Sequence, residues 1–267
     1  IAFEASDQIE PEIQASNAEM YTEDGGTEIT NADEDEDSWT NDSIPYFSWT
    51  EGEDDAEGSG ILGYCLYLGT SSSGDPRTSK GILGTSPEST ASTDCEGGFI
   101  IGTNEIDFTT SSYRGSNWLS SNGSYYLNIT AIDNSGNAKG TPFESFHFQY
   151  DGTNPTNPSG LSAPQTYQSQ IENITIYWAT TGTSGPTDND SEVAGYQYRI
   201  GDTGTWYGSG HTGNEDSGDL ISAGFYTLDT NHDELSEGEN TFYLRTWDNA
   251  GNVADTAISA ILKYSGN

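Results

Sequence analysis

Acidic side chains are the residues of this sequence whose number and placement point to ligand chemistry. The chain has 43 Asp and Glu against 7 Lys and Arg, which gives a formal net charge of -36 over 267 residues. Hard cations take carboxylate and carbonyl oxygens, about six to eight for each Ca²⁺. The acids that matter are those in short loops between apolar segments, because such loops can bring several carboxylates together. Ca²⁺ is therefore the cofactor that we expect.

Catalytic patterns are not found in the sequence. The three histidines, His147, His211 and His232, lack metal-ligand spacing to one another or to a cysteine. The nucleophile elbow, the P-loop and the dinucleotide fingerprint are missing. A pair of carboxylates could hydrolyse a glycoside, but among 43 acids some pair always lies close. We expect a protein that is not an enzyme.

The charge and the hydropathy exclude two classes of partner. A chain this negative repels nucleic acid and anionic membrane surfaces at long range. None of its apolar runs approaches the length of a transmembrane helix, so direct membrane insertion is not expected. The charge suits hydrated cations, high salt or an extracellular surface.

An internal repeat organises the chain. The segment 45–49 ends in Trp49 and is followed by an acidic loop and then by Gly-Tyr-Cys-Leu-Tyr-Leu-Gly at 63–69. In the second half, 174–178 ends in Trp178 and leads through an acidic loop to Gly-Tyr-Gln-Tyr-Arg-Ile-Gly at 195–201. Further along, residues 122–137 match residues 237–252, and both end in Asp-Asn-small-Gly-Asn. Repetition at this scale indicates two copies of one structural unit.

The pattern inside each copy predicts β-structure. Apolar residues alternate with period two, as in Thr241–Trp247, and no stretch keeps a helical period. Asp-Asn-Ala-Gly between two alternating runs is a hairpin signal, because Asn and Gly tolerate positive φ. Short strands with regular turns, repeated once, predict an all-β protein of two tandem antiparallel β-sandwiches.

The repeat resembles the immunoglobulin-like and fibronectin-type-III-like repeats of prokaryotic surface proteins. The Asp-Asn-Ser-Gly-Asn and Asp-Asn-Ala-Gly-Asn hairpins, the Gly-Tyr-x-Tyr strands and the Asp-Gly-Thr-Asn-Pro-Thr-Asn-Pro linker at 151–158 carry the resemblance. It implies immunoglobulin-like sandwiches that act as spacers, scaffolds or adhesive modules. The predicted division is an orphan strand and linker at 1–10, a first domain at 11–152 with an acidic insertion near 23–42, and a second domain at 153–267.

In an immunoglobulin-like sandwich the loop after the second strand, the F–G hairpin and the chain entry lie at one end. That geometry predicts one calcium site in each domain, although braced turns and solvated acids would leave the same pattern. The predicted ligands of the second domain are Asp151, Asn154, Asp188, Asp190, Glu192, Asp248 and Asn249. Those of the first domain are Asp7, Glu10, Glu53, Asp54, Asp55, Asp133 and Asn134.

The first residues resemble the end of a last strand, with Ile1 and Phe3 as its apolar positions. Three interpretations remain open: the tail of a preceding repeat, a strand that pairs with a neighbouring copy, and a flexible terminus. The second would make the chain a subunit of a filament, since a head-to-tail contact that does not close propagates.

Cysteines and sequons point outside the cell. The two cysteines, Cys65 and Cys95, are expected to form a disulfide in an oxidising compartment. Asn-x-Ser/Thr sequons could accept N-glycans in a glycosylating host. The sequon asparagines are Asn41, Asn122, Asn128, Asn173 and Asn189.

The sequence thus predicts an extracellular structural protein of the cell surface: a surface-layer, stalk or filament building block that is stiffened by calcium. Its partners would be copies of itself or flanking repeats of the same polypeptide. One alternative is an adhesin or carbohydrate-binding pair that uses loop aromatics such as Trp206, Tyr207, Tyr113 and Trp118 to contact surface glycans. Another is a non-catalytic spacer of a larger secreted enzyme.

Overall fold

The computed structural model describes residues 7–13, 18–33, 38–88, 95, 97–140, 144–211, 219–230, 232 and 234–266. It divides into unit 1, Ile1–Tyr150, and unit 2, Asp151–Asn267, and each unit is described here by itself. The sequence placed the boundary after residue 152, whereas the structural division falls between Tyr150 and Asp151. The orphan-strand residues Ile1 and Phe3 lie outside the described residues.

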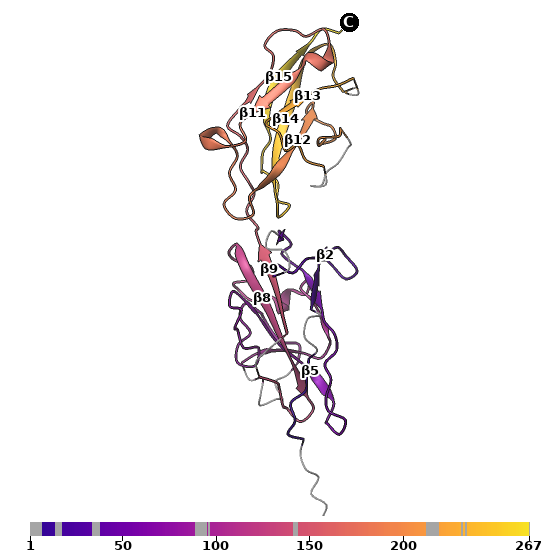
Figure 1. Ribbon diagram of the computed structural model, residues 1–267, viewed down its shortest axis with the longest axis vertical. Helices are drawn as coiled ribbons and strands as arrows, with labels where there is room; N and C mark the ends of the chain where they lie inside the picture. The colour runs from indigo at the N-terminus through magenta and orange to yellow at the C-terminus, as the bar shows by residue number, and fades with distance from the viewer. Residues whose placement is uncertain are drawn as a thin grey trace, which may run out of the picture. The chain divides into compact units, whose positions relative to one another are not determined.

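Unit 1 consists of two sheets (Figure 1). One has the strand order β2-β1-β4-β7 and the other the order β3-β9-β8-β5-β6. Of the paired strands, only β3 and β9 run parallel to one another. The elements are β1 (Glu19–Tyr21), β2 (Glu28–Ile29), β3 (Trp39–Thr40), β4 (Tyr46–Ser48), β5 (Ile61–Gly69), β6 (Phe99–Ile101), β7 (Glu105–Asp107), the 3-10 helix η2 (Ser111–Tyr113), β8 (Gly123–Asp133) and β9 (Glu144–Tyr150).

The acidic insertion near 23–42 contributes strands to both sheets of unit 1. β2 pairs with β1, and β3 pairs with the end of β9, where Thr40 lies opposite Tyr150. The segment therefore belongs to the sandwich rather than being appended to it. Within the acidic run, Asp33 contacts His147 at 2.8 Å, while residues 34–37 lie outside the described part of the chain.

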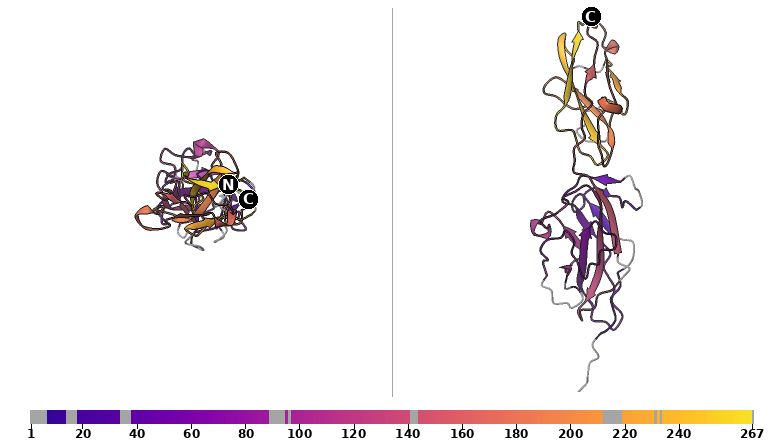
Figure 2. Two further views of the ribbon diagram at one scale, coloured as in Figure 1. Left: turned by 90° about the horizontal axis from the view of Figure 1, so that it is seen from above. Right: turned by 90° about the vertical axis from the view of Figure 1, so that its left-hand side faces the viewer.

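Unit 2 is the smaller sandwich, with one sheet of order β10-β11-β13 and a second of order β12-β14-β15. All its paired strands are antiparallel. The elements are β10 (Leu161–Ser162), the 3-10 helix η3 (Ile171–Asn173), β11 (Thr175–Trp178), the 3-10 helix η4 (Gly182–Ser184), β12 (Val193–Ile200), β13 (Phe225–Thr227), β14 (Gly238–Asp248) and β15 (Ile258–Tyr264). The long strands β8 and β14 run along the length of their respective units (Figure 2).

The segment 151–158, which the sequence suggested as a linker, packs onto unit 2. Thr156 donates its backbone N–H to the Thr187 carbonyl, and Asn157 accepts the N–H of Thr246 at 2.9 Å. Pro155 and Pro158 are buried. Proline has no N–H to leave unpaired, so it suits a chain that enters along the edge of a sandwich.

Period-two alternation explains the two cores. In β14 the buried Phe242 and Leu244 point between the sheets and meet Ile176 of β11 and Tyr198 of β12. Unit 1 has an equivalent core from both of its sheets. The same aromatic pair lies in both cores, at centroid distances of 5.3 Å: Trp49 against Tyr64 in unit 1, and Trp178 against Tyr196 in unit 2.

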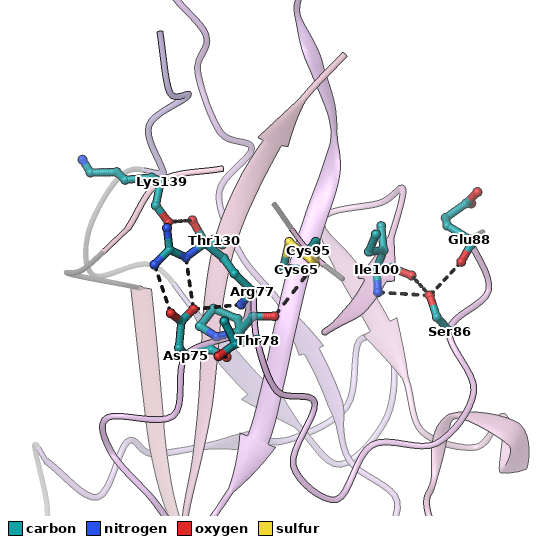
Figure 3. Close-up of a disulfide and its surroundings, with 11 residues drawn as sticks. Cys65, Asp75, Arg77, Thr78, Ser86, Glu88, Cys95, Ile100, Thr130 and Lys139 are labelled. Carbon is teal, nitrogen blue, oxygen red and sulfur yellow. Dashed lines mark hydrogen bonds and ion pairs between the residues drawn. A yellow bond between two sulfur atoms is a disulfide. The ribbon is translucent and has the colours of Figure 1, made fainter. Parts of the chain in front are cut away.

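A disulfide joins Cys65 of β5 to Cys95, as the sequence predicted. Cys65 faces away from the main core and lies in a separate apolar cluster with Ile100, Ile132 and Ala138. Figure 3 shows the disulfide with its two neighbouring groups. On one side is the turn held by the Asp75–Arg77 ion pair. On the other side the Ser86 hydroxyl is hydrogen-bonded to the backbone of Ile100. The disulfide thus fastens the long connection between β5 and β6 to the outer face of its sheet.

The predicted fold class is confirmed: the chain is all-β and forms antiparallel sandwiches. Each unit ends its eleven-residue strand, β8 or β14, in an aspartate that opens a hairpin. Those two aspartates are the starting point of the candidate sites.

Candidate metal sites

The first candidate site lies in unit 2, where three carboxylates converge. Asp151, Asp188 and Asp248 each place one oxygen within 4.8 Å of the other two. Asp151 and Asp248 are buried, with exposed fractions of 0% and 1%. Buried carboxylates need hydrogen bonds and a counter-charge, because desolvation penalises their charge strongly.

The hairpin at the end of β14 positions Asp248. Asn252 donates its backbone N–H to one carboxylate oxygen of Asp248 at 2.8 Å and its side-chain amide to the other at 2.9 Å. The same amide donates to the carbonyl of Asp151 at 2.9 Å. A single asparagine side chain therefore ties the hairpin to the first residue of the unit.

Serine and loop amides position the other two carboxylates. Ser191 donates its N–H and its hydroxyl to one oxygen of Asp151, and the N–H of Thr153 bonds the other. Asp188 accepts the N–H groups of Asp190 and Glu192, each at 3.0 Å. These bonds stabilise the ionised carboxylates and fix their direction.

Unit 1 contains a second group with the same construction. Asp7, Asp54 and Asp133 place one oxygen each within 4.8 Å of one another, and Asp133 is fully buried. Asp133 ends β8 and receives the N–H of Asn137 at 2.9 Å and the Asn137 amide at 2.7 Å. That amide also reaches the carbonyl of Asp7 at 3.3 Å.

The remaining bonds of unit 1 repeat those of unit 2. Ser59 donates its N–H to Asp7, as Ser191 does to Asp151. The amide of Asn134 bonds the carbonyl of Ser59 at 2.9 Å, and the amide of Asn249 bonds the carbonyl of Ser191 at 2.7 Å. Two segments of the chain with different loop sequences thus build one hydrogen-bond pattern twice.

The electrostatics differ between the two groups. The pKa of Asp248 is raised, and burial of its carboxyl is the main cause. The hydrogen bonds from Asn252 lower this pKa, whereas the negative charges of Asp151 and Asp188 raise it further. In unit 1, the backbone N–H groups of Ile9 and Ser59 lower the pKa of Asp7. Three carboxylates held this close repel one another, and a cation between them would remove the repulsion.

The donor set of both groups consists of oxygen atoms, which suits a hard cation such as Ca²⁺. Three carboxylates supply fewer than the roughly six to eight ligands that Ca²⁺ takes, so backbone carbonyls and water would supply the others. The groups contain neither a nucleophile nor a histidine. Their arrangement can hold a cation and, through it, three chain segments.

The structure brings together six of the fourteen predicted ligands, three in each unit. The others shape the loops. Asn134 and Asn249 donate to backbone carbonyls, and Asn154 donates to Asp255. Four contribute through their backbone: Asp55, Asp190 and Glu192 donate N–H groups to ligand carboxylates, and Glu53 forms a bridge with Glu12. Glu10 is exposed.

Sequence reasoning missed Ser59, Ser191, Asn137 and Asn252, which orient the ligands. The signal for the two asparagines was present, because each is the final residue of the repeated Asp-Asn-small-Gly-Asn motif. The two serines lie in loops of unequal sequence, and only the folded structure identifies them as equivalent.

One further group of possible ligands lies in unit 2, where the sequence spacing of the histidines gives no signal. His211, His232 and Glu234 of unit 2 place one ligand atom each within 4.8 Å of one another. The two histidines are far apart in sequence and come from separate loops. Spacing rules detect ligands on one helix or hairpin, and they do not detect this arrangement.

One predicted glycosylation site is excluded. Asn128 is fully buried, its amide donates to the carbonyls of Ser72 and Gly74, and its oxygen accepts from Ser145. A glycan there is incompatible with the folded unit. Asn41, Asn173 and Asn189 are exposed and Asn122 is half-buried, so these four remain predictions.

The loop aromatics suggested as glycan contacts pack against other side chains, and three of them, Tyr113, Trp118 and Tyr207, are half-buried. Trp206 is 8% exposed, and its ring contacts the guanidinium groups of Arg199 and Arg245. Trp118 packs on Phe108 and donates its ring N–H to the Ser43 carbonyl. Tyr113 packs against Phe99, and Tyr207 stacks on His211. These contacts support the interpretation of the four aromatics as packing residues.

Comparison with known proteins gives a likeness of fold. No protein-family model matches the chain, and no curated protein matches its sequence. Among solved structures, the chain is similar to fibronectin(III)-like modules of CbhA from Clostridium thermocellum, at 13% identity and a TM-score of 0.38, over 85% of this chain and 88% of that one. It is also similar to a tetra-tandem repeat in the extending region of a large adhesion protein, at 17% identity and a TM-score of 0.25, over 84% of this chain.

The chain spans 47% of the adhesion-protein structure. The first description names fibronectin(III)-like modules and the second a tandem repeat. The strand orders of the chain itself are those of two-sheet sandwiches. In the described residues, no helix has the length and apolar character needed to cross a membrane.

Proposed function

We propose that this chain is a non-catalytic, extracellular structural module in which each unit binds Ca²⁺ where the chain enters it. The cation would link three segments of each unit: the entry segment, the loop before β5 or β12, and the hairpin at the end of β8 or β14. The supporting observation is the recurrence of one carboxylate group, with its asparagine and serine supports, in both units.

The mechanical role follows from the position of the ligands along the chain. Asp151 directly follows Tyr150, the last residue of β9. A cation bound there would restrict the backbone at the point where one unit gives way to the next. Calcium would thus act on the stiffness of the chain as well as on the stability of each unit.

The test is thermal unfolding of the full chain in Ca²⁺ and in chelator. A ligand that binds only the folded state stabilises it by about 2.7 kcal/mol per site at 100 times its Kd. We expect the melting temperature to fall in chelator. Asp248→Asn and Asp133→Asn should each abolish the calcium response of their own unit, as measured by hydrogen exchange of the two hairpins.

Asp190→Asn is the matched control, because Asp190 lies in the same loop as Asp188 and is exposed outside the carboxylate group. Its calcium response should equal that of the unchanged chain. An identical melt in Ca²⁺ and in chelator would remove the calcium proposal and leave the carboxylates as turn braces.

Assembly is the second part of the proposal, with copies of the chain or flanking repeats as partners. The Cys65–Cys95 disulfide is consistent with an oxidising, extracellular compartment. Light scattering in Ca²⁺ and in chelator measures self-association. Growth into large linear particles in Ca²⁺ supports a filament or surface layer. A monomer under both conditions rules out self-association and leaves the stalk or spacer, whose partners are repeats of its own polypeptide.

A further inference from the structure

A cluster of histidine and tyrosine rings lies in unit 2, apart from the carboxylate groups. The Tyr198 hydroxyl lies 2.6 Å from His211 Nδ1, 2.8 Å from His232 Nε2 and 3.1 Å from the Tyr226 hydroxyl. The rings of His211 and His232 are 4.0 Å apart. Glu234 joins them, so that one ligand atom from each of these three residues lies within 4.8 Å of the others.

Asp229 orients the buried ring of His232. His232 Nδ1 lies 2.9 Å from a carboxylate oxygen of Asp229 and 3.0 Å from its carbonyl, which are both acceptors. The backbone N–H of Asp229, a donor, lies 3.1 Å from the same nitrogen. Asp229 therefore contacts Nδ1 through three groups, and the other ring nitrogen, Nε2, is directed into the cluster. A carboxylate beside one ring nitrogen is the usual outer partner of an imidazole that binds a metal through the other.

His211 presents its two ring nitrogens to different partners. Nδ1 lies 2.6 Å from the Tyr198 hydroxyl, which itself donates to the Tyr226 hydroxyl, and Nε2 faces Glu234. A neutral imidazole has one nitrogen with a proton and one with a lone pair, so the tautomer with the proton on Nδ1 directs the lone pair of Nε2 toward Glu234.

The contact between His211 and Glu234 is longer than a hydrogen bond and is closer to the spacing of two ligands on one metal ion. His211 Nε2 lies 3.8 Å from Glu234 Oε1. That is too long for a hydrogen bond, for which N···O is about 2.7–3.2 Å. Two ligands on a tetrahedral ion with bonds of about 2.0–2.1 Å lie roughly 3.4 Å apart. Among the described residues, Glu234 Oε1 is buried and has no hydrogen-bond partner.

We propose that His211, His232 and Glu234 form a binding site for a divalent cation of the zinc class, with Asp229 as the residue that positions His232. Two imidazoles and one carboxylate are a donor set that zinc-like ions accept, whereas Ca²⁺ prefers oxygen alone. To bind, His232 Nε2 exchanges its contact with Tyr198 for the ion. The site is independent of the proposed calcium groups, which use other residues.

Cobalt titration of the full chain tests this proposal. The chain is first freed of metal with dipicolinate and then kept in excess Ca²⁺, so that the carboxylate groups do not compete. We expect saturable binding of one Co²⁺ per chain, with a visible spectrum of tetrahedral nitrogen and oxygen ligation that Zn²⁺ abolishes by displacement. The melting temperature of unit 2 should rise on binding.

Variants grade the response. His211→Gln and Glu234→Gln should weaken Co²⁺ binding by more than about 100-fold, which exceeds the 10–100-fold typical of a lost outer partner. Asp229→Asn should weaken it by about 10–100-fold. His147→Gln is the matched control, since His147 of unit 1 contacts a single carboxylate, that of Asp33, and should bind Co²⁺ as the unchanged chain does.

Circular dichroism in chelator checks that each variant folds. If His211→Gln does not fold, the nearly isosteric Glu234→Gln decides the test. Equal Co²⁺ binding by the unchanged chain and by Glu234→Gln would overturn the proposal. So would a unit 2 whose melting temperature responds to pH but not to Co²⁺, because a proton would then be the ion that the cluster holds.

Discussion

The two units share one sandwich framework, but different contacts hold the loops on the outer face of their sheets. Both have the Trp–Tyr pair, the aspartate that ends a long strand, and the asparagine that ties it to the chain entry. They differ on the outer face of the sheet formed around β5 or β12. Features common to both units are therefore those that the repeat requires, whereas the disulfide and the arginine contacts are each found in one unit.

The difference is clearest at one pair of equivalent positions. Cys65 lies opposite Thr130 in unit 1, and Gln197 lies opposite Arg245 in unit 2. Cys65 forms the disulfide, whereas Gln197 accepts the guanidinium of Arg245 and the ring N–H of Trp247. On the outer face of the sheet, a loop is thus held to the strands by a disulfide in unit 1 and by hydrogen bonds and cation–π contacts in unit 2.

Substitution of the shared tryptophan should have the largest effect. Trp178→Ala or Trp49→Ala removes a buried side chain and leaves its tyrosine partner unpacked, at a cost of about 3–5 kcal/mol in unfolding free energy. Urea unfolding followed by hydrogen exchange in each unit measures this. Each substitution should affect its own unit, and simultaneous loss of both units would show that they do not fold independently.

Loss of the disulfide should affect unit 1 alone. Cys65→Ala with Cys95→Ala opens a connection with a sequence separation of 30 residues. Loop-closure entropy for that length corresponds to about 3–4 kcal/mol. Thermal melts with and without reductant measure the loss, and the alanine pair should make the chain insensitive to reductant. A comparable loss in unit 2 would contradict the assignment of the disulfide's effect to unit 1 alone.

Alkaline pH should destabilise unit 2 through Tyr196. Burial raises the pKa of Tyr196 from 10.0 to about 12, while its contact with Trp178 opposes the change. The neutral phenol therefore favours the folded state: its stabilisation is complete below pH 10 and is lost as the pH rises through about 12. The loss is on the order of 1–3 kcal/mol.

Tyrosinate absorbance and circular dichroism between pH 9 and pH 12.5, roughly the range around a phenol pKa, follow this transition. The Tyr196→Phe variant keeps the ring and removes the ionisable group. It should lose less stability over the same range than the unchanged chain. Equal losses would place the alkaline transition at other tyrosines.

The cation–π contacts should give the smallest effect. Arg245→Lys keeps the charge but loses the stacking on Trp206 and the paired bonds to Gln197. We expect a loss of about 1–2 kcal/mol, confined to unit 2. Urea melts measure it, and Lys80→Arg in unit 1 is a surface control that should leave stability unchanged. An unaffected Arg245→Lys would mean that packing of Trp206 alone holds this face.

The sequence was sufficient for the fold because the period-two pattern and the repeat both depend on local spacing. The six converging aspartates could be predicted for a related reason: a sandwich brings the same loops together whatever their sequence. The boundaries of the first strands of unit 1 were harder to predict from the sequence. β2 and β3 have two residues each and lie in an acidic stretch without an alternating pattern.

The histidine cluster could not be predicted from spacing. Its members belong to two loops that only the packing of Tyr198 between the sheets brings together. Unit 1 has Leu66 at the position equivalent to Tyr198, so the internal repeat also gave no signal. The burial of Asn128 could not be predicted either. A sequon is defined by three consecutive residues, whereas burial depends on how the whole sheet packs.

The tie between Asn252 and Asp151 has a consequence for a chain under tension. A pull along the polypeptide reaches unit 2 at Asp151, where the carbonyl is bonded to the hairpin and one carboxylate oxygen is bonded to the loop before β12. These few bonds would take the force before any ladder of strand pairs does. Unit 2 would therefore yield first by release of its entry segment, a short extension that spares the sandwich and reverses when the pull ends.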